Sequence, residues 1–136
     1  MVRIILDGKP VAKSRPRFTK RGFAYTPPTT VHYEKALKAE AESEMEGRPP
    51  LECPVRVRLE YWFPIPKSYS KKKREELIGQ PHTKKPDLDN LVKTLDALNG
   101  VVFKDDSQIV DIRAQKMYGE DPYTIIEVTF DDVFSA

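Results

Sequence analysis

Residues 55–63 carry the most regular pattern in this sequence, because apolar residues at the odd positions alternate with Arg, Glu or Trp at the even positions. Strict alternation puts the two sets of side chains on opposite faces of a β-strand. The segment is therefore predicted to be a strand with one buried face, which favours a sheet covered by a second layer.

The rest of the chain supplies the remaining strands and the covering helices. We expect strands near 2–6, 110–116 and 126–130, the last two forming a hairpin, and a helix from Thr29 or Thr30 to about residue 46. The order predicts an α/β fold of the α+β type with two layers, in which helices pack on a mixed, mostly antiparallel sheet of about four strands. At this length, residues 1–136 are expected to form a single domain.

A further helix is predicted to begin after Pro86, since a proline disfavours the helical conformation in the residue before it. Leu91, Leu95 and Leu98 recur at helical spacing and define a buried stripe, and Gly100 lies where a helix stop belongs. Asp87 or Asp89 is the expected N-cap. One face of this helix should pack on the sheet and leave the opposite face open.

Acidic residues gather around the open face. Asp89, Lys93 and Asp96 are spaced to share it, and Asp87 can converge with Asp89 if it is extended. Asp105 and Asp106 follow just beyond the helix. Carboxylates this close repel each other, and oxygen donors without His or Cys select Mg²⁺ or Mn²⁺ over Zn²⁺. The sequence thus suggests a metal site whose partner is a phosphate ester.

A simpler interpretation explains the same residues without a metal. Acidic side chains at a helix N-terminus complement the helix dipole, and Lys93 could pair with Asp89 one turn earlier. An Asp-x-Asp tripeptide alone does not decide between the two interpretations.

The longer pattern is more specific. Asp-Leu-Asp-Asn-Leu-x-Lys-x-x-x-Asp-Ala-Leu, then Asp-Asp-x-Gln-Ile-Val-Asp and a Lys on the following strand, resembles the RusA family of Holliday-junction resolvases over roughly residues 86–117. Carried over by position, the resemblance implies Asp87, Asp89 and Asp106 as catalytic and metal-binding residues and Lys93 as the catalytic lysine. Asp105 and Asp96 are further candidates, either of which could bind the metal or orient one of its ligands.

The resemblance also implies an activity. It implies a Mg²⁺-dependent endodeoxyribonuclease, with Mn²⁺ as a substitute ion, that resolves four-way DNA junctions by paired symmetric nicks in DNA recombination and repair. A junction has near two-fold symmetry and one chain carries one site, so a homodimer is expected.

Charge is unevenly distributed although the net charge is only +2. Residues 1–26 carry +6 and residues 67–85 carry +5, whereas residues 119–136 carry −5. This asymmetry indicates a basic face for a polyanion. The candidate DNA-binding residues are Lys13, Arg15, Arg17, Lys84, Lys85 and Lys116.

Two other functions compete with the nuclease. One is a DNA-binding module without catalysis, in which the carboxylates are caps and ion pairs. The other, a metal-dependent phosphoryl or sugar-nucleotide transferase, is disfavoured because no Gly-rich phosphate loop accompanies the Asp-x-Asp. A single cysteine, no signal peptide and no long apolar run predict a cytoplasmic protein with no membrane segment.

Overall fold

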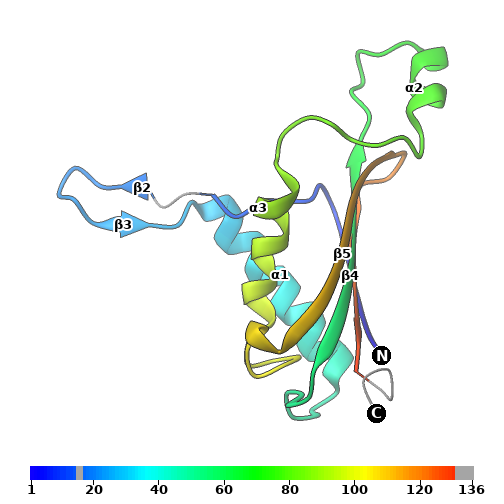
Figure 1. Ribbon diagram of the computed structural model, residues 1–136. Helices are drawn as coiled ribbons and strands as arrows, with labels where there is room; N and C mark the ends of the chain where they lie inside the picture. Colours follow the sequence, from blue (N-terminus) through cyan, green and yellow to red (C-terminus); the bar gives the residue numbers. More distant parts are fainter. Residues whose placement is uncertain (15–16, 131–136) are drawn as a thin grey trace.

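The computed structural model describes residues 1–14 and 17–130. Figure 1 shows two layers, with α1 and α3 on one side of a sheet. In chain order the elements are β1 (Val2–Asp7), β2 (Arg17–Phe18), β3 (Ala24–Tyr25), α1 (Pro28–Met45), β4 (Val55–Pro64), α2 (Lys71–Leu77), α3 (Leu88–Val92), the 3₁₀ helices η1 (Lys93–Leu98) and η2 (Asp106–Gln108), β5 (Ile109–Gly119) and β6 (Tyr123–Thr129). The predicted α+β fold is confirmed.

Four strands form the main sheet of the described residues, in the order β1-β6-β4-β5. β6 is antiparallel to both β1 and β4, and β5 is parallel to β4. The sheet is therefore mixed and mostly antiparallel, as predicted. The expected hairpin between the last two strands is wrong, because β4 lies between β5 and β6.

The short connection from β5 to β6 crosses the end of β4. It spans two interstrand spacings, about 10 Å. A Cβ on Gly119 would lie 2.9 Å from Cε3 of Trp62, so glycine lets the backbone pass close over the indole. β4 ends at Pro64, which has no N–H to extend the ladder. Both residues are therefore compatible with a chain that crosses closely over the end of β4.

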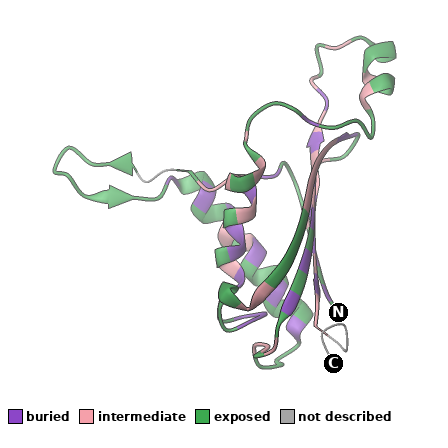
Figure 2. Cartoon of the chain, in the orientation of Figure 1, coloured by how far each residue is buried: buried purple, intermediate pink, exposed green. Residues whose placement is uncertain are grey.

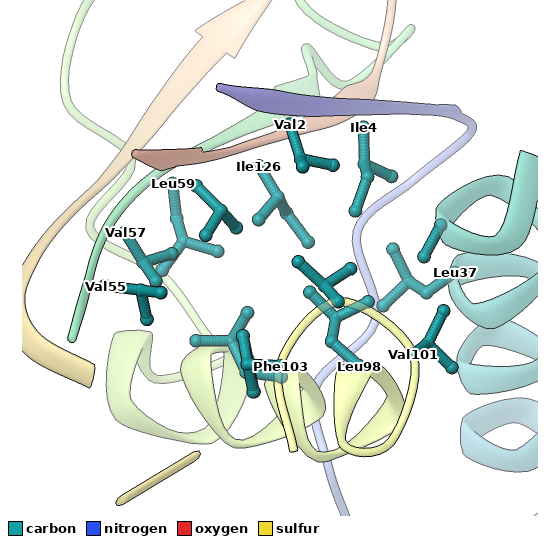
Figure 3. Packing of buried hydrophobic residues seen from close by; sticks show 14 of the residues in the cluster. Val2, Ile4, Leu37, Val55, Val57, Leu59, Leu98, Val101, Phe103 and Ile126 are labelled. Carbon is teal, nitrogen blue, oxygen red and sulfur yellow. The ribbon is translucent and has the colours of Figure 1, made fainter. Parts of the chain in front are cut away.

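The alternation in β4 is confirmed, since its five odd-numbered residues are all exposed by 1% or less. Figure 3 shows apolar side chains of β1, β4 and β6 meeting Leu37 of α1 and the apolar residues Leu98, Val101 and Phe103. The core thus fills the space between the sheet and the helical layer, and the site described below lies on that layer.

The helix predicted after Pro86 is present in two parts. α3 is a regular α-helix for five residues, and η1 continues it as a tighter 3₁₀ helix. Leu91, Leu95 and Leu98 are exposed by 0–4%, which confirms the buried leucine stripe. Because the stripe fixes this helical segment against the core, the acidic face opposite it points outward.

The helix α1 begins two or three residues earlier than a threonine cap would allow. Pro27 occupies its N-cap, so neither predicted threonine caps it. Thr30 is instead buried, and its hydroxyl donates to the carbonyl oxygen of Ala12 at 3.2 Å. This contact ties the segment after β1 to the start of α1.

None of the helices in the described part of the chain combines the length and apolar character needed to cross a bilayer.

Candidate metal centre and nucleic-acid interface

An open pocket of about 960 Å³ lies at the N-terminal end of α3. Asp87, Asp89 and Lys93 all line it, and both aspartates are exposed. The structure therefore brings together three of the four residues that the resemblance assigns to catalysis. The other lining residues are Ala12, Lys13, Ser14, Thr26, Lys85, Pro86 and Asn90.

The structure supports only part of the simpler interpretation of the carboxylates in this pocket. Asp87 occupies the N-cap in an extended conformation, yet its side chain accepts no capping hydrogen bond within the described residues. Lys93 donates to Oδ1 of Asn90 at 3.3 Å. It forms no ion pair with Asp89 in the part of the chain that the structure describes. Asp89 still benefits from the helix dipole because it lies in the first turn.

Lys116 shapes the pocket from behind. Its Nζ donates to the carbonyl oxygens of Lys84 at 2.7 Å and Pro86 at 2.8 Å, and so holds the backbone that leads into Asp87. Its strand pairing explains this position, because Lys116 is in register with the buried Tyr61 and so lies on the covered face of the sheet. The sequence contained this information, because Lys116 occupies the same alternate positions along the strand as Ile112 and Ala114. A direct phosphate contact by Lys116 stays a prediction.

One member of the second acidic pair, Asp105, caps a short helix. Asp105 is the N-cap of η2, where its carboxylate accepts from the backbone N–H of Ser107 at 3.0 Å. The side chain of Gln108 accepts from the N–H of Asp105 at 2.9 Å, which completes a capping box. The hydrogen bonds from Ser107 lower the pKa of the Asp105 carboxyl. Its role as a metal ligand stays a prediction.

Asp106 lies among like charges. Partial desolvation raises the pKa of its carboxyl, the nearby carboxylates of Asp96 and Asp105 raise it further, and Asn99 acts in the opposite direction. Asp96 in turn pairs with Lys13, Oδ2 to Nζ, at 3.0 Å. Because Lys13 also lines the pocket, this ion pair connects the second acidic group to the first.

The two acidic groups flank opposite ends of the α3–η1 segment. Asp87 precedes the segment, whereas Asp106 lies near Asp96 and Asn99 at its far end. Helical rise alone separates Asp89 from Asp96 by roughly 12 Å. Among the described residues, no three His, Cys, Asp or Glu side chains form a group that could hold a metal ion. Convergence of Asp87, Asp89 and Asp106 on one ion therefore stays a prediction.

The donor chemistry of the pocket nevertheless fits a hard divalent cation. Mg²⁺ keeps several waters and is commonly bound by one or two carboxylates together with phosphate oxygens of the substrate. Asp87 and Asp89 supply two exposed carboxylates on one pocket wall, beside the cationic side chains of Lys85 and Lys93. Such a pocket suits a phosphate diester as the remaining source of ligands.

The predicted DNA-binding residues differ in how the structure places them. Lys13 and Lys85 line the pocket, although Nζ of Lys13 is already paired with Asp96 and, at 3.5 Å, with Glu34. Lys84 donates to the hydroxyl of Tyr69 at 3.0 Å. Arg17 is exposed on β2, and Arg15 lies outside the described residues. Phosphate contacts by these side chains stay predictions.

Comparison with known proteins gives two findings. The family model described as endodeoxyribonuclease RusA matches residues 7–129. A protein of Bacillus subtilis (strain 168) named uncharacterized protein YqaN is 36% identical over 129 residues, a match that covers 89% of this chain and 90% of that protein. The family match includes the pocket, both acidic groups and all the strands of the sheet except the first five residues of β1.

Proposed function

The chain belongs to the RusA family of endodeoxyribonucleases, and from this premise we propose that it is a Mg²⁺-dependent endonuclease that resolves four-way DNA junctions by paired nicks. Its expected context is DNA recombination and repair. The observation that carries the proposal is the pocket that Asp87, Asp89 and Lys93 line together. Within the described residues, Asp87 makes no capping bond and neither aspartate forms an ion pair with Lys93.

The roles follow from the chemistry of each side chain. Asp87 and Asp89 would hold a divalent ion, which when bound supplies an activated water and stabilises the leaving oxygen. Lys93 would lie against the scissile phosphate and offset the negative charge that grows during the reaction. Lys116 would keep the Asp87 backbone in place through its two carbonyl contacts.

The second acidic group adds Asp106, with Asp96 beside it. A nearby cation stabilises crowded carboxylates, so Asp106 would bind a further divalent ion, or would bind the same ion as Asp87 and Asp89 when DNA is bound.

One chain provides one pocket at α3. Paired nicks therefore require two copies, which supports the expected homodimer.

The test uses a labelled mobile four-way junction, a linear duplex and a flap, each incubated with the protein in Mg²⁺ or in EDTA. Paired nicks in the junction alone, only with Mg²⁺ and absent with Asp89→Asn, are expected. If the wild-type protein binds the junction but makes no nick in Mg²⁺ or Mn²⁺, the chain is a DNA-binding module and the nuclease proposal is wrong.

A further inference from the structure

The β2–β3 hairpin, residues 17–25, forms an arm that projects away from the sheet and helices (Figure 1). A tight turn closes it: the N–H of Gly22 donates to the carbonyl of Thr19 at 2.9 Å, and the N–H of Thr19 donates to the carbonyl of Phe23 at 2.8 Å. Figure 2 shows that the arm is exposed along its length. Its side chains are therefore available to a partner.

The arm carries aromatic side chains on both faces. Arg17 is opposite Tyr25 and Phe18 is opposite Ala24, so Phe18 faces one way and Tyr25 the other. The exposed fractions of Phe18, Phe23 and Tyr25 are 71%, 69% and 43%. Large aromatic surfaces left in water indicate a binding surface when they cluster on one element.

The charge of the arm identifies the kind of partner. Residues 17–25 include Arg17, Lys20 and Arg21 and no acidic residue. Cations interleaved with exposed aromatic rings are typical of surfaces that bind unpaired nucleotides, in which the cations contact phosphates and the rings stack on bases. A fully paired duplex offers no base face to such rings.

Both ends of the arm lead to the metal-site pocket. Ser14 precedes it and Thr26 follows it, and both line that pocket beside Asp87 and Asp89. The N–H of Lys13 donates to the carbonyl of Asn90 at 2.9 Å, which fixes the first end against α3. A DNA strand in the pocket would therefore pass the base of the arm.

We propose that this arm binds unpaired bases at the branch point of DNA held in the pocket, with Phe18 and Phe23 stacking on the bases and Arg17, Lys20 and Arg21 contacting phosphates. The proposal rests on the proposed function for the location of the DNA. It does not require cutting, because stacking needs neither the ion nor Lys93.

The test measures binding in EDTA by fluorescence anisotropy, with two labelled substrates of equal length: a linear duplex and the same duplex with a short single-stranded gap. The double variant Phe18→Leu/Phe23→Leu keeps apolar side chains but removes the rings. The matched control is Phe18→Trp/Phe23→Trp. Stacking on one base contributes enough that its loss weakens binding by about 10-fold or more.

The expected result is a loss of at least 10-fold on the gapped substrate for the leucine variant, with duplex binding within twofold of wild type. The tryptophan variant should keep the preference for the gap. The slope of affinity against salt should not change, since no cation is removed. Unchanged melting temperatures would show that both variants fold, as expected for exposed positions.

Two outcomes would overturn the proposal. One is equal affinity of wild type and the leucine variant for the gapped substrate. The other is a leucine variant that sediments as a monomer where the wild type is a dimer, which would show that the arm packs on a second copy. Absence of Mg²⁺-dependent cutting by the wild type would refute the proposed function but leave the preference for unpaired bases intact.

Discussion

The acidic groups at the two ends of the α3–η1 segment differ in how the surrounding chain uses their carboxylates. At the start, Asp87 and Asp89 face a wide pocket with lysines on its wall, and Asp87 accepts no capping bond within the described residues. At the far end, Asp105 is held in a capping box and Asp106 is crowded by Asp96. The same residue type thus serves an open site in one region and local structure in the other.

The comparison shows what separates a ligand from a cap. The carboxylate of Asp105 accepts from the backbone N–H of Ser107. The side chain of Gln108, three residues later, accepts from the N–H of Asp105 and completes the capping box. Asp87 also precedes a helix, but within the described residues its side chain makes no hydrogen bond that caps it. A carboxylate that makes no capping bond keeps both of its oxygens available to an ion, so we expect substitutions at the two ends to have different effects.

The largest effect is expected for Asp89→Asn. Removing a carboxylate that holds the ion should slow junction cleavage in Mg²⁺ by at least about 100-fold, a loss of the size seen when one stabilising group is removed from an active site. Junction binding should stay the same or tighten, since a negative charge near phosphates is lost. Single-turnover cleavage and gel-shift titration measure the two properties, with Asp105→Asn as the control. Normal cleavage by Asp89→Asn would assign the Asp87–Asp89 pair a structural role.

An intermediate effect is expected for Lys116→Met, which removes both contacts to the backbone before Asp87. Loss of a group that orients a metal ligand reduces activity by about 10- to 100-fold. We expect a lower cleavage rate for bound junction, with unchanged junction affinity and salt slope. Lys84→Met is the comparison, because this nearby exposed lysine is a candidate phosphate contact: its loss should weaken junction affinity without slowing cleavage of bound junction. A weaker affinity with a shallower salt slope would instead assign Lys116 to a phosphate.

The smallest effect is expected at Asp105. Asp105→Ala removes the cap, which contributes about 1 kcal/mol, and should lower the melting temperature by about 4 °C. Asp105→Asn keeps a capping oxygen and should melt within about 1 °C of wild type. Cleavage by Asp105→Asn should stay within about threefold. A loss as large as that of Asp89→Asn would show that Asp105 is a metal ligand after all.

Local patterns were enough to predict much of this fold. Period-2 alternation identified β4 and the leucine spacing identified the buried side of α3–η1, because both depend on which side chains a single element must bury. Helical spacing placed Asp89 and Lys93 on one face, and an extended Asp87 was expected to converge with Asp89; all three line the pocket. Asp96, predicted on the same face, does not line it. Ser70, a residue type preferred at helix N-caps, likewise caps α2, since its side chain accepts from the N–H of Lys73.

Features that depend on distant contacts were not predictable. The place of β4 between β5 and β6 results from pairing between segments far apart in the sequence, which no single element reveals. The carbonyl contacts of Lys116 join residues about 30 positions apart. The capping box of Asp105 was a missed local signal, because its Asp-x-x-Gln spacing is visible in the sequence.

The most direct measurement of the central claim is a Mn²⁺ titration of the protein followed by electron paramagnetic resonance, which reports free ion. The account predicts saturable binding by the wild type and by Asp105→Asn, and at least about 10-fold weaker binding by Asp87→Asn/Asp89→Asn, since two of the few protein ligands are lost. Wild-type Mn²⁺ affinity in the Asp87→Asn/Asp89→Asn variant would contradict the claim that these two carboxylates hold the ion.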